Sequence, residues 1–254
     1  RQYSIWIASL EKTKDGTNDL LVDKIVAECN LCLDRIQSGI QLLVKDDDAR
    51  LAFCFANMAI NLQTRWGRKE DLVYRPFQIA FVLMSIESIL CKDSKFRDTC
   101  DLLWVPTGGG KTEAYLVLVA IDMAYRRLKF VKNEKSGAGV SVFTRYTLRL
   151  LTIQQFRRSL SMFSAAEYLR VENISSPNPS GWRPDGFSGN ADFLWGSTPF
   201  SVGLWVGQGV TPNRLEDSAG TANGKFTVRS GALTILKQDP RDPYGEGEPA
   251  QILN

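Results

Sequence analysis

One glycine-rich segment, residues 106–112 with the sequence Pro-Thr-Gly-Gly-Gly-Lys-Thr, constrains the fold of this chain more than any other feature. Consecutive glycines let backbone N–H groups turn towards an anion without Cβ clashes, and the start of a helix adds partial positive charge. An apolar run, Leu102–Val105, lies before the segment, and a largely apolar stretch, 112–131, follows it. This order predicts a short strand, a phosphate-binding loop and a buried helix.

The residues of this loop have separate predicted roles. Lys111 supplies a point charge for the β- and γ-phosphate oxygens of ATP, and the hydroxyl of Thr112 is the predicted Mg²⁺ ligand. These two are the predicted catalytic residues, with ATP and Mg²⁺ as the cofactors. Val105 stands where the general pattern has glycine, a form that resembles the loop of superfamily 2 helicases. The simpler alternative is a glycine-rich turn with a surface lysine.

A second element, Tyr-Arg-Pro-Phe-Gln at 74–78, ends 33 residues before Lys111. Superfamily 2 helicases place a glutamine at a similar distance ahead of the loop. Such a carboxamide can accept a hydrogen bond from adenine N6 and donate one to N7, and a Tyr or Arg side chain can stack on the base. The alternative is an ordinary helix start with proline in its first turn. The predicted nucleotide-binding residues are Tyr74, Arg75, Gln78, Thr107, Gly108, Gly109, Gly110, Lys111, Thr112 and Glu113.

The positive charge of the chain is concentrated in residues 121–170. This stretch has ten Lys and Arg against three Asp and Glu, a net +7, whereas the whole chain has a net charge of +3. Such a local field favours a polyanionic partner, while the alternative is a solvated helix face. Residues 145–156 resemble helicase motif Ia, and 210–214 resemble motif Ib, segments that hold a nucleic-acid backbone. The predicted nucleic-acid contacts are Arg145, Thr147, Arg149, Gln154, Thr211 and Arg214.

Apolar periodicity predicts two long helices near the N-terminus and an alternation of strands and helices after them. Helices are expected at 18–44, 46–66, 76–89, 112–131 and 147–169, and strands at 102–105, 139–144 and 201–206. The predicted apolar stripes are Leu21, Ile25, Cys29, Leu33, Ile36, Ile40 and Leu43 in the first helix, and Leu51, Phe55, Met58, Leu62 and Trp66 in the second. The alternation predicts an α/β fold with a parallel sheet covered by helices. The predicted domains are a helical segment at 1–70, an α/β domain at 71–238 and a linker at 239–254.

Two absences from the sequence narrow the possible chemistry. The chain has no histidine, which excludes a Ser-His-Asp triad, a Cys-His pair and any histidine metal ligand or general base. It also has no Asp-Glu dipeptide, the carboxylate pair that usually holds Mg²⁺ and activates water in a superfamily 2 motor. We therefore expect nucleotide binding without efficient hydrolysis, and a chain that is one part of a longer polypeptide.

The cysteines and the hydropathy indicate the compartment. Five cysteines, an odd number, argue against a disulfide-stapled secreted scaffold. The N-terminal region shows no signal peptide, and no run approaches the roughly 20 apolar residues of a membrane span. We expect a soluble, cytoplasmic protein without a membrane partner. Cys29 and Cys32 have the spacing of metal ligands, but no second pair completes a site, so buried thiols are the favoured interpretation.

Taken together, these segments resemble the DrmA-like helicase family of the bacterial DISARM anti-phage system. The resemblance is carried by residues 74–78, 103–115, 145–156 and 203–207, and the run at 145–156 is its most specific part. It covers roughly 74–214. It implies a RecA-like P-loop NTPase lobe, the first lobe of a superfamily 2 motor, in an ATP-dependent DNA helicase or translocase. It also implies two partners: DNA, duplex with a single-stranded region, and a second subunit of the defence system.

Two other functions are compatible with the same motifs. A superfamily 2 RNA helicase has the same phosphate loop, and only the run at 145–156 argues against it. A nucleotide-gated DNA-binding scaffold with a vestigial ATPase belongs to a different class, and the missing acidic pair favours it. A DNA- or RNA-stimulated ATPase assay separates the first two, and the presence or absence of an acidic pair beyond Asn254 separates both from the third.

Overall fold

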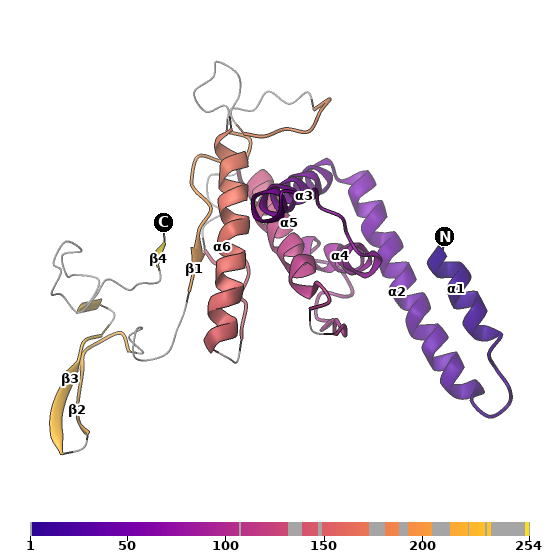
Figure 1. The fold of residues 1–254 in the computed structure, drawn as a ribbon, viewed down its shortest axis with the longest axis horizontal. Helices are drawn as coiled ribbons and strands as arrows, with labels where there is room; N and C mark the ends of the chain where they lie inside the picture. Colours follow the sequence, from indigo (N-terminus) through magenta and orange to yellow (C-terminus); the bar gives the residue numbers. More distant parts are fainter. Residues whose placement is uncertain are drawn as a thin grey trace. The chain divides into compact units, whose positions relative to one another are not determined.

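A computed structural model describes residues 2–106, 108–131, 139–146, 149–172, 181–187, 193–204, 214–222, 224–231, 233–234 and 252–253. The chain forms two compact units, Arg1–Thr198 and Pro199–Asn254. The first contains α1 (Gln2–Glu11), α2 (Asp19–Lys45), α3 (Asp47–Arg68), α4 (Pro76–Leu90), α5 (Lys111–Val131) and α6 (Arg149–Val171) (Figure 1). The second contains β1 (Val202–Gly203), β2 (Ser218–Ala222), β3 (Lys225–Arg229) and β4 (Ile252–Leu253).

The predicted parallel sheet is wrong, and with it the RecA-like α/β lobe. The described residues are mostly helical, and their strands form two small antiparallel pairs, β1 with β4 and β2 with β3. Of the three predicted strands, 102–105 and 139–144 are irregular, and 201–206 contributes only the two residues of β1. Residues 205–206 lie outside the described part of the chain.

Missing strand partners explain this error. A strand needs a neighbour for its backbone N–H and C=O groups, and the apolar pattern of 102–105 does not specify where that neighbour comes from. Among the described residues no strand pairs with this segment, and Leu102 and Trp104 are 82% and 88% exposed. Phe143, in the second irregular segment, is 77% exposed. The apolar character of these two segments therefore does not place them in a sheet.

The predicted helices are confirmed in type and approximate bounds. The five expected helices correspond in order to α2, α3, α4, α5 and α6, and α1 was not expected. Residues 147–148, at the predicted start of the last helix, lie outside the described residues. None of the helices in the described ranges is both long and apolar enough to cross a membrane. The first unit includes both 1–70 and most of the predicted α/β domain.

The core of the first unit lies where α3 packs against α5. Alanines lie on the facing surfaces of both helices and are completely buried, which lets the two backbones approach closely. The fully buried side chains at this junction include Ala49, Ala52, Ala56, Ala59, Ala120 and Ala124. The ring of Phe55 lies 4.1 Å from that of Trp195, which places this tryptophan against α3. This packing fixes the position of α5 and of the loop before it.

A polar network joins the C-terminal end of α5 to the start of α3. Asp46 caps α3 by accepting a hydrogen bond from Ala49 N at 3.0 Å, and the hydroxyl of Tyr125 donates to the same carboxylate at 3.0 Å. The Lys129 ammonium lies 3.3 Å from Asp46 and 3.0 Å from Asp48. Burial acts to raise the pKa of Asp46, but these hydrogen bonds and the Lys129 charge outweigh it and hold that pKa below its ordinary value.

A buried ion pair fixes the chain just before the phosphate loop. Arg35 of α2, only 5% exposed, donates two hydrogen bonds to Asp101, at 2.5 and 2.7 Å. Its guanidinium also lies 4.7 Å from the centre of the Phe96 ring. A bidentate pair of this kind holds a planar geometry. Asp101 immediately precedes residues 102–106, so the pair positions the segment that leads into the loop.

Candidate nucleotide-phosphate site

The predicted phosphate loop is a tight turn directly before α5. Gly109 N donates to Pro106 O at 3.0 Å, which closes the turn. Gly108 and Gly110 have φ values of +78° and +90°, a region that side chains with a Cβ rarely adopt. Helix α5 then starts at Lys111, where the first N–H groups have no intrahelical acceptor. The glycines therefore give the segment a tight turn at a helix start, and its binding of phosphate stays a prediction; Thr107 lies outside the described residues.

Lys111 folds back over this turn. Its ammonium donates to the carbonyl oxygen of Val105 and lies 3.3 Å from that of Pro106. Neutral carbonyls are weaker partners for an ammonium than charged phosphate oxygens. A bound phosphate can therefore replace these contacts with a net gain in electrostatic energy. Thr112, the predicted Mg²⁺ ligand, follows in the first turn of α5 and is half-buried.

The Tyr-Arg-Pro-Phe-Gln element meets the loop through two of its side chains. Arg75 donates to Gly109 O at 2.8 Å, and the amide nitrogen of Gln78 donates to Gly110 O at 2.8 Å. The other end of the Gln78 carboxamide accepts from Arg75 N at 2.7 Å, and the residue is only 5% exposed. Both polar ends of Gln78 are thus engaged by the protein. Two elements more than 30 residues apart in the sequence are brought together at one site.

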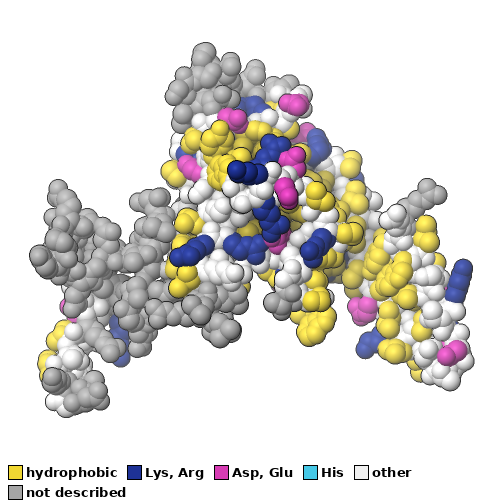
Figure 2. Space-filling model, in the orientation of Figure 1, with side chains coloured by type: hydrophobic (Ala, Val, Ile, Leu, Met, Phe, Trp, Pro, Cys, Tyr) yellow, Lys and Arg dark blue, Asp and Glu magenta, His cyan; other side chains and the backbone are white. Residues whose placement is uncertain are grey.

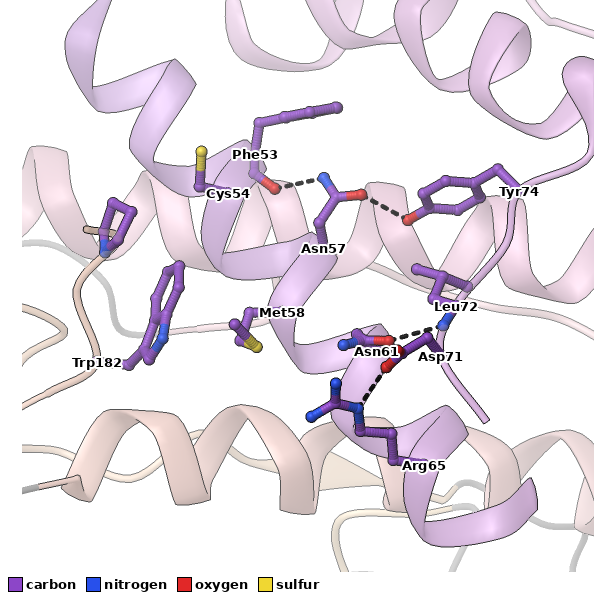
Figure 3. A pocket seen from close by; sticks show the side chains of 11 residues that line it. Phe53, Cys54, Asn57, Met58, Asn61, Arg65, Asp71, Leu72, Tyr74 and Trp182 are labelled. Carbon is purple, nitrogen blue, oxygen red and sulfur yellow. Dashed lines mark hydrogen bonds and ion pairs between the residues drawn. The ribbon is translucent and has the colours of Figure 1, made fainter. Parts of the chain in front are cut away.

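Tyr74, the third side chain of this element, lines a different hollow (Figure 3). Its hydroxyl donates to the Asn57 side-chain oxygen at 2.8 Å, and burial raises its pKa well above the usual range, so the phenol stays protonated. The hollow has a volume of about 540 Å³. It is lined by Phe53, Cys54, Asn57, Met58, Asn61, Arg65, Asp71, Leu72, Tyr74, Trp182 and Pro184. Stacking of Tyr74 on a base stays a prediction.

Glu113 connects the start of α5 to α6. One of its carboxylate oxygens, Oε1, lies 2.5 Å from the Arg158 guanidinium. Its second oxygen, Oε2, is buried and has no hydrogen-bond partner among the described residues. The sequence predicted Glu113 as a nucleotide-binding residue but did not single out Arg158. The adjacent arginines 157 and 158 look equivalent in the sequence, and only the helix packing shows that Arg158 is the one that reaches Glu113.

The structure describes only some of the predicted nucleic-acid contacts, and these lie in both units. Arg145 and Gln154 are exposed in the first unit, and Arg214 is exposed in the second. Thr147 and Thr211 lie outside the described residues, as does the side chain of Arg149. The space-filling view shows basic side chains gathered on the central helical part, with acidic side chains among them (Figure 2). A nucleic-acid role for these residues stays a prediction.

The described residues offer no ready-made metal centre. Within those ranges, no group of three or more His, Cys, Asp or Glu side chains could hold a metal ion. Cys29 and Cys32 are free, half-buried thiols on α2. The donor near the loop that suits Mg²⁺ is the Thr112 hydroxyl, and Mg²⁺ at such sites takes most of its other ligands from phosphates and water. The loop residues therefore fit a magnesium–nucleotide complex better than a free ion.

The site is thus a candidate phosphate-binding loop at the start of α5. Lys111 folds over its turn, and Arg75 and Gln78 hold it by hydrogen bonds. No family model matches the sequence. The chain is 39% identical, over 236 residues, to the DISARM protein DrmA of Bacillus paralicheniformis, an alignment that covers 85% of this chain. This similarity confirms the resemblance to DrmA-like DISARM proteins, and the helicase part of that resemblance stays a prediction. The aligned part spans 19% of that relative's length.

Proposed function

We propose that this chain is the ATP-phosphate-binding part of an anti-phage defence protein. The similarity to a DISARM protein supports the defence role. One observation supports nucleotide binding above all: Arg75 and Gln78 converge on the carbonyls of Gly109 and Gly110, beside Lys111 at the start of α5. These two hydrogen bonds hold the loop by its carbonyls, and the Lys111 ammonium lies beside it on the carbonyl of Val105.

The proposed binding mode follows from these positions. Backbone N–H groups of the loop and of the first turn of α5 surround the β-phosphate, and Lys111 leaves the carbonyls of Val105 and Pro106 for the phosphate oxygens. The Thr112 hydroxyl would supply a ligand to the metal of a magnesium–nucleotide complex. When bound, Mg²⁺ neutralises phosphate charge.

Nucleic-acid engagement is the second part of the proposal. Arg145 and Gln154 are exposed in the unit that contains the loop, and residues 121–170 have a net charge of +7. Arginine and amide side chains bind backbone phosphates without reading sequence. We assign helicase or translocase activity on DNA, and assembly with a second defence subunit, to the full-length protein of which such a chain forms a part.

The direct test is nucleotide binding by the Lys111→Ala variant of the full chain. We expect fluorescent ATP to bind the wild type in the presence of Mg²⁺ and the variant to lose about 30- to 150-fold in affinity, because a charge-assisted contact of this kind is worth about 2–3 kcal/mol. Lys24→Ala, an exposed lysine on α2, is the matched control and should bind normally. Equal affinities in wild type and Lys111→Ala would contradict the proposal.

A further inference from the structure

The ion pair between Glu113 and Arg158 joins two elements with different proposed ligands. Glu113 lies in the first turn of α5, two residues after the loop lysine, and Arg158 lies on α6. Their side chains meet at 2.5 Å and are 26% and 35% exposed, so the contact is partly shielded but open to solvent. The pair is therefore close enough to the loop to affect it and accessible enough to be opened by a ligand.

The carboxylate of Glu113 is incompletely bonded in this arrangement. Oε1 faces Arg158, whereas Oε2 is buried without a hydrogen-bond partner among the described residues. A Cβ built on Gly110 would lie 3.6 Å from Oε2, so this oxygen borders the loop itself. Arg158 is thus the charge that neutralises a carboxylate beside the phosphate site. Any ligand that binds the Arg158 guanidinium in place of Glu113 changes the electrostatic potential at the loop.

The surroundings of Arg158 allow its side chain to change partner while the helix stays in place. Gln63 of α3 donates to the backbone oxygen of Arg158 at 2.9 Å, which ties this turn of α6 to the core. The neighbouring Arg157 and Gln154 are exposed on the same helix. A nucleic-acid phosphate bound near them is a charged acceptor. It can compete with the Glu113 carboxylate for the Arg158 guanidinium.

We propose that the Glu113–Arg158 pair couples nucleic-acid binding on α6 to nucleotide binding at the loop. This inference rests on the proposed function, which supplies both ligands. When a nucleic-acid backbone phosphate binds the Arg158 guanidinium, that guanidinium no longer neutralises the Glu113 carboxylate. The negative carboxylate then repels the nucleotide phosphates next to Gly110. Nucleic acid therefore weakens nucleotide binding, and by linkage nucleotide weakens nucleic-acid binding by the same factor. In this arrangement Arg158 is a positioning residue for the Glu113 carboxylate. Binding of DNA therefore promotes release of the nucleotide.

The test measures the affinity of fluorescent ADP for the full chain with and without saturating single-stranded oligodeoxynucleotide. For the wild type we expect DNA to weaken ADP binding about fivefold, the lower end of typical coupling between sites. Glu113→Gln and Arg158→Gln should each reduce this ratio to about one, and the double variant should match either single variant. Arg158→Lys keeps the charge and should retain part of the coupling.

Arg157→Gln is the matched control, because it removes an exposed arginine next to Arg158 but leaves the ion pair intact. It should lower DNA affinity and keep the wild-type ratio. An undiminished ratio in Arg158→Gln, or a ratio of one in a wild type that binds both ligands, would overturn the coupling. A wild type that binds no nucleotide overturns the proposed function and the coupling with it. Thermal unfolding of each variant separates a lost coupling from a lost fold.

Discussion

The two ends of α5 use polar side chains in opposite ways. At the C-terminal end, Tyr125 and Lys129 are committed to the carboxylates of Asp46 and Asp48, which cap and anchor α3. At the N-terminal end, Lys111 rests on neutral backbone carbonyls. The first end is a closed structural network, whereas at the second end the Lys111 ammonium has only neutral partners.

The difference between the two ends of α5 indicates which end contributes to the stability of the fold and which to ligand binding. Groups whose best partners are already in the protein gain little from a ligand, whereas an ammonium on carbonyls gains from a phosphate. The unbonded Oε2 of Glu113 belongs to the same end of the helix. Substitutions at the C-terminal end should therefore change the free energy of unfolding, and substitutions at the N-terminal end should change ligand affinity.

Among substitutions of the loop glycines, the largest effect is expected for Gly110→Ala. Its φ of +90° is strained for any residue with a Cβ, and a Cβ there would lie 2.7 Å from the Gln78 amide nitrogen, so Gln78 must move and its hydrogen bond to Gly110 O is disturbed. Backbone strain of about 1–3 kcal/mol predicts a loss of ATP affinity of about 10- to 100-fold. Gly108→Ala is the control: its φ is also positive, at +78°, but a Cβ would meet nothing within 4 Å. Fluorescence titration should rank Gly110→Ala well below Gly108→Ala, and the reverse order would argue against a fixed loop.

Asp46→Ala tests the opposite end of the helix. It removes the cap of α3 together with the acceptor for Tyr125 and a partner of Lys129. We expect urea unfolding to show a loss of about 1–2 kcal/mol in stability, as for other N-cap residues. ATP affinity should stay within about twofold of the wild type, a difference below 0.5 kcal/mol.

Asp47→Ala controls for the loss of a carboxylate in the same region. Asp47 pairs with Arg50, but its side chain is 86% exposed. Its replacement should change stability by less than about 0.5 kcal/mol. If Asp46→Ala weakened ATP binding as strongly as it lowered stability, the two ends of α5 would not be functionally separate.

Gln78→Ala gives the smallest predicted change at the loop end. It removes one hydrogen bond to Gly110 O, worth about 1 kcal/mol, so affinity should fall about fivefold. Because both ends of the carboxamide are engaged by the protein, we expect ATP and GTP to lose affinity equally. Parallel titrations with the two nucleotides measure this. A clearly greater loss for ATP would show that Gln78 changes partners and reads adenine.

The helices were predictable from the sequence, but their buried faces were only partly so. Leu51 and Phe55 of the predicted α3 stripe are buried, whereas Trp66 is 51% exposed. On α2 the predicted Leu21 and Ile25 are exposed. Periodicity counts large apolar side chains, whereas several of the fully buried positions of α3 and α5 are alanines, whose small size leaves them ambiguous in a sequence.

The candidate site was predictable in its parts but not in its connections. The loop and the 74–78 element follow from local chemistry, since glycines and a helix start have recognisable backbone demands. The contacts of Arg75 with Gly109 and of Glu113 with Arg158 join distant segments. No local pattern encodes which arginine reaches which partner. The prediction of a parallel sheet was wrong for the same reason, because a strand depends on a neighbouring strand that its own residues do not specify.

Hydrogen exchange of the full chain, with and without Mg-ATP, tests the central claim most directly. If the N-terminal end of α5 binds nucleotide phosphates, amides of residues 108–113 should become protected on addition of ATP, because they bond to the phosphates or are held by the bound loop. Amides of 46–50, at the network around Asp46, should exchange at the same rate in both samples. Unchanged exchange at 108–113 under conditions where ATP is bound would contradict the account.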